Sequence, residues 1–456
     1  MTASKLASTP ENPPRRVLLV VFITLLLDLV GFSIIFPLYP AMLLHYLENE
    51  PDGLVIGAVL QAVEALQTLA GGGALHSLQD AALFGGVLGS AYAGLQFLCT
   101  PIAGRLSDRL GRRPVLLFCI GGMAVSYGLW LFAGAFWVLV LSRLLGGVMS
   151  ANIATASAAV ADVTEGPART RGMALVGVAF GIGFILGPAL GGGFSLIDLT
   201  ALFPGLVAYG INPFSMPALV ALVLTLANLM LVWLYFGETL PEGDRRTTTG
   251  RRPIFQALQG GGVPGSARIN WAWFLYQVAF AGTTFALPFH AAQQLGYGPA
   301  QITLLLVFMG LVLAVMQGGY VRRMSTRISP KLMLLHGMGF VLPALAIIGF
   351  AQTPLAFYAG LLLLGIGAAQ VQPCCAALAS LYAPAQAQGR AMGDFRSLGS
   401  LGRVVGPILI ALAYWRVGPS ASFLAGALFV AVPLVLATRL PALPEDKPVV
   451  PPEPII

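Results

Sequence analysis

The chain has 456 residues, of which 57% are hydrophobic and only 9% are charged, and its mean hydropathy is +0.83. This composition excludes a soluble globular protein and indicates an all-α protein of membrane-spanning helices. The net charge of +7 is not evidence for nucleic-acid binding, because basic residues also gather on one side of a membrane. The four cysteines lie in apolar runs without metal-ligand spacing, so we expect them to be reduced, and we expect no metal or cofactor.

Twelve apolar segments are long enough to cross a bilayer. The predicted spans are 17–44, 84–103, 114–132, 136–160, 172–194 and 217–236, followed by six that begin near 271, 301, 332, 355, 391 and 420. We therefore expect two six-helix halves, at 17–236 and 271–440, joined by a linker at 237–270. Polar tails at 1–16 and 441–456 complete the chain. A loop insertion at about 46–83 follows the first span, and its apolar residues between Ile56 and Leu66 have helical spacing. Either an amphipathic surface helix or a solvated loop fits this pattern.

The basic residues are distributed unevenly between the two sides of this predicted bundle. Of the 25 Lys and Arg residues, 21 fall in the tails and in the loops after the even-numbered spans. Only Arg416 lies in a loop on the other side. Because positive loops stay in the cytoplasm, both termini are expected there. A bacterial inner membrane and a eukaryotic membrane fit equally well.

An internal repeat links the two halves. Five residues of span 5 recur 219 positions later in span 11; the pairs are Arg171 with Arg390, Met173 with Met392, Gly183 with Gly402, Gly187 with Gly406, and Pro188 with Pro407. In spans 1 and 7, Gly31 and Pro37 recur as Gly282 and Pro288, 251 positions later. The larger offset places an insertion of about 32 residues early in the first half, where the long loop lies. A duplicated six-plus-six membrane fold is typical of transporters, whose substrate sites lie between the halves.

A charged segment at 104–113 separates spans 2 and 3. Its pattern is Gly104, Asp108, Arg109, Gly111, Arg112 and Arg113, and it closely resembles the signature loop of the major facilitator superfamily. Three other segments resemble the tetracycline-efflux and drug–proton antiporter branch, and the chain is similar overall to the animal tetracycline-transporter-like proteins. These segments are Leu27–Pro40, Arg143–Gly147, and Gly183, Gly187, Pro188, Gly191 and Gly192 in span 5. The resemblance implies a secondary transporter that moves a small amphipathic organic molecule, by proton-coupled efflux.

Three charged residues lie inside predicted spans and are candidates for the transport machinery. Asp28 lies near the bilayer midplane, where a carboxylate costs roughly 2.5–3.5 kcal/mol and should face a cavity or a partner. It is our candidate proton carrier; a purely structural hydrogen-bonding role is the alternative. Arg143 is either a counter-ion to Asp28, a ligand for an anionic substrate, or structural. Arg403 corresponds to Phe184 in the first half, so its charge is not inherited from the repeat. Together the three charges sum to +1, which favours an anionic or zwitterionic substrate.

Uncharged polar residues within the spans are either substrate contacts or hydrogen bonds between helices. The candidates are Gln96, Asn152, Gln277 and Gln370. The glycines of span 5 indicate close helix packing. We interpret the segment at 104–113 as a conformational latch. Asp108 is expected against the start of span 11 and Arg396, and Arg112 against Asp162, so that these contacts hold the halves together on the cytoplasmic side.

The sequence therefore predicts a monomeric multi-pass transporter whose partners are a small organic substrate, protons and the lipid bilayer. A uniporter, an importer, or a non-transporting receptor or scaffold with the same fold are the alternatives. We find no nucleophile–base spacing, metal cluster or phosphate loop, so no enzyme activity is expected.

Overall fold

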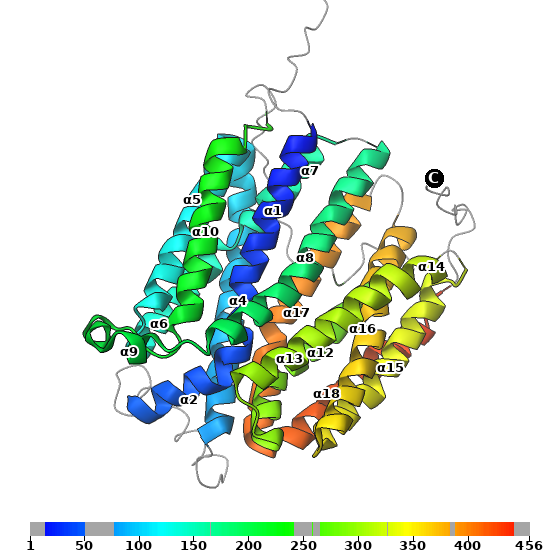
Figure 1. Cartoon of the computed structure of the whole chain (residues 1–456). Helices are drawn as coiled ribbons and strands as arrows, with labels where there is room; N and C mark the ends of the chain where they lie inside the picture. The colour runs from blue at the N-terminus through cyan, green and yellow to red at the C-terminus, as the bar shows by residue number, and fades with distance from the viewer. Residues whose placement is uncertain are drawn as a thin grey trace, which may run out of the picture.

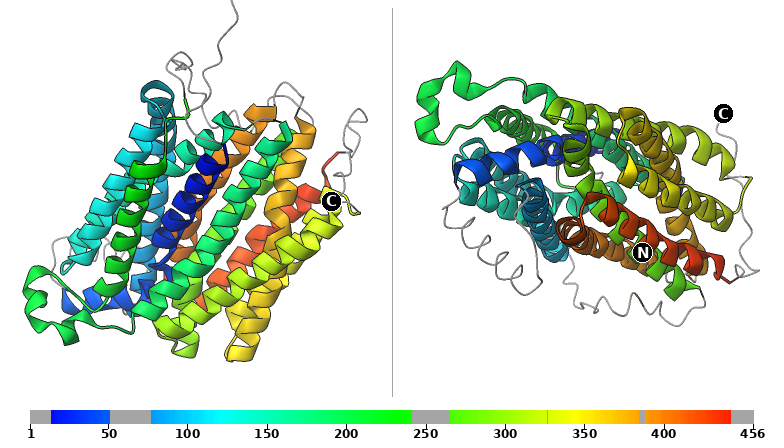
Figure 2. Two further views of the ribbon diagram at one scale, coloured as in Figure 1. Left: turned by 45° about the horizontal axis from the view of Figure 1, so that its top comes forward. Right: turned by 90° about the horizontal axis from the view of Figure 1, so that it is seen from below.

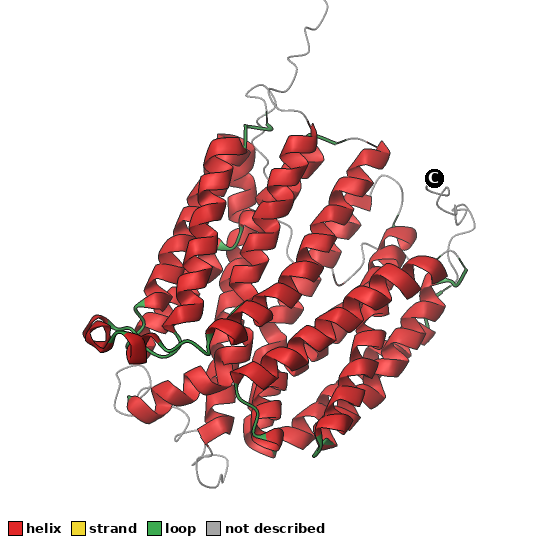
Figure 3. Ribbon diagram, in the orientation of Figure 1, coloured by secondary structure: helices red, strands yellow, loops and turns green. Residues whose placement is uncertain are grey.

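The computed structural model describes residues 14–50, 77–164, 166–240, 258, 265–325, 327–383 and 388–441. Within these ranges the secondary structure is helical, joined by short links (Figure 3). The segment in which an amphipathic surface helix was one expectation, both tails beyond these ranges, and most of the predicted linker lie outside the described residues.

The helices fall into two groups, one from the first half of the chain and one from the second (Figure 1). The first group comprises α1 (Pro14–Ser33), η1 (Phe36–Leu38), α2 (Tyr39–Asn49), α4 (Ser77–Leu110), α5 (Arg112–Leu131), α6 (Phe136–Met149), α7 (Asn152–Asp162), α8 (Gly166–Phe194), α9 (Leu199–Leu202), η2 (Pro204–Tyr209) and α10 (Ser215–Tyr235). The second comprises α12 (Ser266–Leu295), α13 (Pro299–Val315), the π-helical turn η5 (Met316–Val321), α14 (Arg322–Met324), α15 (Pro330–Phe350), α16 (Pro354–Tyr382), α17 (Gln388–Val417) and α18 (Pro419–Thr438).

Eleven stretches of the described residues are long and apolar enough to span a membrane. The long helix α12 lies alongside them, packed on α17 and α18, and provides the twelfth. It carries more polar side chains than its neighbours, among them Gln277, Thr283 and His290. Its 30 residues rise about 45 Å at ~1.5 Å per residue, which is more than enough to cross a bilayer.

At two places the helix limits differ from those of the predicted segments. The first span is not one helix over 17–44, because α1 ends at Ser33 and the chain resumes as α2 only at Tyr39. Pro37 lies in this break and Pro40 is the second residue of α2, and their missing N–H groups cannot continue the hydrogen-bond ladder from α1. The second half begins earlier than 271, because α12 already starts at Ser266 inside the predicted linker.

The two ends of the bundle differ. We call the end at which α1 begins, α4 ends and α16 ends the terminal face, and the other end the opposite face (Figure 1). Contacts between the two groups run through α4 against α17 and α8 against α13. In Figure 2 these helices lie at the boundary between the blue-to-green and the lime-to-red parts of the chain.

The two groups are in close contact toward the opposite face. A Cβ atom on Gly86 of α4 would lie 2.3 Å from the Cβ of Ala411 of α17, and one on Gly192 would lie 1.7 Å from Oγ1 of Thr303. Trp415 Nε1 donates to Asp80 Oδ1 across the same boundary at 3.1 Å. The opposite face is therefore closed by close packing of small residues and by this hydrogen bond.

Toward the terminal face the same helices separate. Gly94 of α4 still approaches Val404 of α17, at 3.7 Å from its would-be Cβ. Leu98 and Ile102, one and two turns further along α4, are exposed, and Cβ atoms on Gly104 or Gly393 would meet nothing within 4 Å. The structure therefore represents a conformation that is closed at the opposite face and open at the terminal face.

Glycines set the packing within each group. In α8, would-be Cβ atoms on Gly183 and Gly187 would collide with α1, and one on Gly191 would collide with Ile34 directly after α1. In α17, those on Gly402 and Gly406 would collide with α12 in the same way, at 2.5 Å from Gln277 Cβ and 2.4 Å from the Val278 carbonyl oxygen. The repeated glycines thus form equivalent close helix pairs in the two groups, while Gly192 serves the contact between the groups.

This packing gives a matched pair of variants. A Cβ on Gly191 would lie 1.9 Å from the carbonyl oxygen of Ile34, whereas one on Gly193 would meet nothing within 4 Å. We expect Gly191→Ala to lower the free energy of unfolding by about 1–3 kcal/mol, because α8 must move away from α1. Gly193→Ala should be neutral or slightly stabilising. Unfolding in mixed micelles measures both, and equal stability of the two variants would contradict the close packing.

Candidate functional site

Asp28 is held by two amide groups inside the first group of helices. It lies on α1 and is 8% exposed. Asn152, at the start of α7, donates through Nδ2 to Asp28 Oδ2, and Asn228 of α10 donates to Oδ1 at 3.1 Å. No cation forms an ion pair with Asp28 among the described residues. Both partners are neutral, so the site can hold the carboxyl group in either protonation state.

The side chain of Asn228 is also placed to respond to protonation of Asp28. The Oδ1 atom of Asn228 is buried and has no hydrogen-bond partner. A protonated Asp28 carries an O–H donor, and amide oxygens are acceptors. A small rotation of either side chain would let Asn228 accept that hydrogen bond, so the site has a ready acceptor for an added proton.

Arg143 does not pair with Asp28. The guanidinium lies over two aromatic rings, 4.8 Å from the centroid of Trp130 and 5.7 Å from that of Tyr127, and Nη2 donates to Ser142 Oγ at 3.0 Å. Of the alternatives for Arg143, direct pairing with Asp28 does not occur in this conformation, because the ring faces take the place of the carboxylate. Arg143 is 4% exposed, and its Nε lacks a partner.

Tyr127 lies between the Asp28 region of α1 and Arg143. A Cβ on Gly31, one turn after Asp28, would lie 2.9 Å from Tyr127 Oη, and the ring of the same tyrosine faces Arg143. Its hydroxyl group is buried without a hydrogen-bond partner. The carboxyl and guanidinium groups of the first half are thus neighbours through one aromatic side chain.

The other predicted cavity residues do not converge on one point. Arg403 of α17 is exposed and donates to Ser400 Oγ at 2.9 Å, with no carboxylate partner among the described residues. Gln370 is buried in α16 and donates to the Ile366 carbonyl of its own helix at 2.9 Å. Gln277 is buried where α12 meets Gly402, and Gln96 is half-buried on α4. Their roles as substrate contacts remain predictions.

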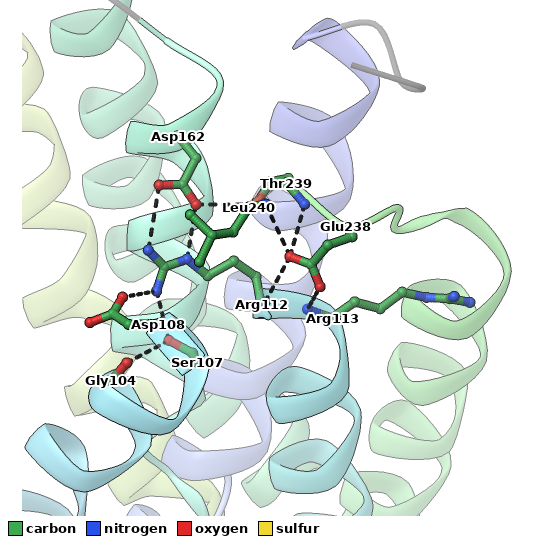
Figure 4. Close-up of polar contacts among 9 residues, drawn as sticks. All are labelled: Gly104, Ser107, Asp108, Arg112, Arg113, Asp162, Glu238, Thr239 and Leu240. Atoms are coloured by element: carbon green, nitrogen blue, oxygen red, sulfur yellow. Dashed lines mark hydrogen bonds and ion pairs between the residues drawn. The ribbon is translucent and has the colours of Figure 1, made fainter. Parts of the chain in front are cut away.

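The charged segment between α4 and α5 forms a dense polar network (Figure 4). Arg112 lies at its centre and is buried. Its Nη1 donates to Asp108 Oδ1 at 2.6 Å and to Ser107 Oγ at 2.7 Å, and its Nε donates to Asp162 Oδ2 at 2.9 Å. One guanidinium therefore joins the end of α4, the start of α5 and the end of α7.

Glu238, just after α10, completes this network, and it is absent from the residues predicted from the sequence. Its carboxylate accepts from the backbone N–H groups of Arg112 at 2.8 Å and Arg113 at 3.2 Å, the first residues of α5. These N–H groups have no partner within their own helix, and a negative charge is favourable at a helix N-terminus. Gly111, with φ of +105°, leaves room for the carboxylate, since a Cβ there would lie 2.3 Å from Glu238 Oε2.

The network differs from the predicted latch. All its members belong to the first group of helices, so the Arg112–Asp162 pair cannot join the two groups. No ion pair or hydrogen bond connects Asp108 to Arg396 in the described part of the chain, and Arg396 is exposed on α17. Because the terminal face is open here, a latch that closes this face would be released. Arg109 is exposed, and Arg113 donates to the Trp233 carbonyl at 2.7 Å.

Comparison with known proteins agrees with this architecture. The Major Facilitator Superfamily model matches residues 21–407 and 271–454. The chain is 34% identical to Major facilitator superfamily domain-containing protein 10 of Homo sapiens, over 94% of each protein, and 28% identical to the class C tetracycline resistance protein of Escherichia coli, over 93% of the chain and 96% of that protein.

A solved structure gives the same result. The crystal structure of the human organic anion transporter MFSD10 (TETRAN) superposes with a TM-score of 0.72 at 32% identity, and covers 94% of this chain and all of that one. The predicted fold class and the resemblance to tetracycline-efflux and animal tetracycline-transporter-like proteins are confirmed. The chain therefore belongs to the Major Facilitator Superfamily and is a multi-pass membrane transporter, not an enzyme.

Proposed function

We propose that this transporter exchanges a small organic anion for protons by alternating access. The observation that carries the proposal is the distribution of charge inside the bundle. Asp28 is a buried carboxyl group with neutral donors only, whereas Arg143 and Arg403 are cations without a carboxylate partner among the described residues. A site of this kind has one group that can exchange a proton and two that favour a negative ligand.

The relatives support an organic anion as the substrate class. One is described as an organic anion transporter, and another is named for tetracycline resistance. Arg143 lies among aromatic side chains, so an acidic group that approached the guanidinium would do so in apolar surroundings, which suit an aromatic anion.

We also propose that the terminal face lies in the cytoplasm, that the transporter works as a monomer, and that net movement is outward. The basic loops support the first point. Arg105, Arg109, Arg112, Arg322 and Arg323 all lie at the terminal face, where positive loops are retained in the cytoplasm. The open terminal face would then be the side on which a cytoplasmic substrate enters.

The test is transport in proteoliposomes of the purified full chain, with an imposed pH gradient and labelled tetracycline or an aromatic carboxylate as substrate. A pH gradient that drives accumulation, together with proton movement when substrate is added, is the expected result. Transport that ignores the pH gradient would indicate a uniporter, and no transport of any anion or zwitterion would overturn the proposal.

Arg403 gives a separate prediction about the substrate. We expect Arg403→Gln to raise the KM for an aromatic carboxylate about ten- to a hundredfold, since a hydrogen bond to a charged group contributes about 1.5–3 kcal/mol. The KM for a neutral analogue should change little. Arg403→Lys, which keeps the charge, is the control and should recover part of the affinity. An equal loss for charged and neutral substrates would show a structural role instead.

A further inference from the structure

The connection between α8 and α10 presents an unusual surface. We call residues 195–214, which contain α9 and η2, the apolar hairpin. All nine residues from Ala201 to Tyr209 are exposed, and none carries a charge. Exposed fractions reach 60% for Leu202, 56% for Phe203 and 72% for Tyr209. An uninterrupted apolar surface of this kind is unfavourable in water and marks a contact with another apolar phase.

The fold itself does not need this segment. In the second group of helices, the equivalent connection between α17 and α18 is the single residue Gly418. The apolar hairpin is therefore an addition specific to the first half. Its exposed side chains cannot be explained by closure of the helical bundle, because the same bundle closes with one residue at the matching position.

Hydrogen bonds and close packing hold the C-terminal end of the apolar hairpin against the helical bundle. Asn212 donates to the Ala133 carbonyl at 2.7 Å, and Ser215 Oγ donates to the Leu131 carbonyl at 2.7 Å. Gly210 has φ of +88° and lies so close to the α5–α6 turn that a Cβ would be 2.5 Å from the Phe132 carbonyl oxygen. These contacts fix the direction in which the hairpin leaves the bundle.

Several polar groups of the hairpin are paired within the hairpin itself. Its one charged residue, Asp198, caps α9 by accepting from Thr200 N at 2.8 Å and Thr200 Oγ1 at 2.6 Å. The backbone N–H groups of Phe203, Leu206 and Gly210 donate to carbonyls within the hairpin, at 2.8, 3.0 and 3.0 Å. Internal satisfaction of the backbone is what contact with a lipid phase requires.

The position of the hairpin identifies the apolar phase. It projects sideways from the bundle at the level where α6 begins and α10 begins (Figures 1 and 2). Phe132 and Trp137, at the adjoining ends of α5 and α6, are also more than half exposed. Aromatic side chains at helix ends are characteristic of the membrane–water interface, so the hairpin continues the lipid-facing surface of the first half.

We propose that the apolar hairpin inserts into the headgroup–acyl boundary of the leaflet at the opposite face. There it covers its apolar side chains and anchors the first half of the transporter laterally. This inference depends on membrane insertion of the chain and not on the identity of the substrate.

The test uses spin labels on single cysteines in the full chain, reconstituted in liposomes of neutral phospholipid. Cys99, the one partly exposed native cysteine among the described residues, is first replaced by Ser. Labels at Leu206→Cys and Val207→Cys are compared with Gln352→Cys, an exposed loop residue at the same face, and with Val223→Cys, an exposed residue within α10. The readout is the ratio of collisions with apolar oxygen to collisions with a water-soluble nickel complex.

We expect the ratio at the two hairpin positions to exceed that at Gln352 by roughly threefold or more, and to be lower than at Val223, as an interfacial depth requires. A ratio equal to that at Gln352 would show a hairpin in water and overturn the proposal. Exclusion of both collision partners would also overturn it, because it would show that protein, such as a second copy of the chain, covers the hairpin.

Discussion

Asp28→Asn is expected to reduce pH-gradient-driven transport to the level of protein-free liposomes. An asparagine cannot release a proton, but it has the size of the carboxyl group and can still accept one hydrogen bond from Asn152 or Asn228. The fold should therefore persist, as binding of a labelled substrate to the purified variant can show. The measurement is substrate-dependent proton flux, followed with a pH-sensitive dye inside the liposomes.

Asn228→Ala is the companion variant for this experiment. It keeps the carboxyl group and removes one of its two amide donors, so we expect reduced but measurable flux with a displaced pH profile. A structural role for the amide would lower the amount of active protein and leave the pH profile in place. If Asp28→Asn still responds fully to a pH gradient, the proton is carried elsewhere and the proposed coupling is wrong.

Arg112→Ala is expected to destabilise the folded protein. Removing one partner of a buried ion pair costs about 3–5 kcal/mol, because the other partner is left without compensation. Asp108 and Asp162 are 34% and 19% exposed, so water screens part of this penalty, and about 2 kcal/mol is a more realistic loss. Arg112→Lys should recover only part of it, since an ammonium group cannot reach three acceptors in the guanidinium geometry.

Unfolding in mixed micelles measures these effects, and Arg109→Ala is the matched control. Arg109 belongs to the same motif, but it is exposed and takes no part in the network of Figure 4, so its replacement should change stability by less than about 0.5 kcal/mol. Equal losses for the two variants would mean that the motif acts through overall charge. No loss for Arg112→Ala would remove the network as a source of stability.

Local sequence patterns predicted much of the fold. Apolar runs identified the long helices, and the offset of 219 residues between Gly183 and Gly402 predicted two related halves whose glycines prove to pack equivalent helix pairs. The break after Ser33 was missed, although Pro37 and Pro40 were visible. An apolar run has the same hydropathy whether or not prolines interrupt its hydrogen bonds, so length alone could not reveal it.

The site residues were predicted less completely, because their partners come from distant helices. Asn228 is 200 residues from Asp28, and Glu238 is 126 residues from Arg112. A signal existed for each: Asn228 is the one amide side chain in α10, and Glu238 is the first charge after that helix. The pairing of Arg143 with aromatic rings could not be predicted, because nothing in the spacing of Trp130 and Arg143 shows that α5 and α6 bring them together.

The contact between Gly86 and Ala411 has a consequence for the conformational equilibrium. At the opposite face the two halves approach through small residues and one hydrogen bond, from Trp415 to Asp80, so the attraction there depends steeply on distance and little on salt. At the terminal face the exposed groups include charged side chains such as Arg109 and Arg396, and salt would screen the interactions between charges there. Ionic strength should therefore change the populations of the conformations through the terminal face only, because the packing at the opposite face depends little on salt.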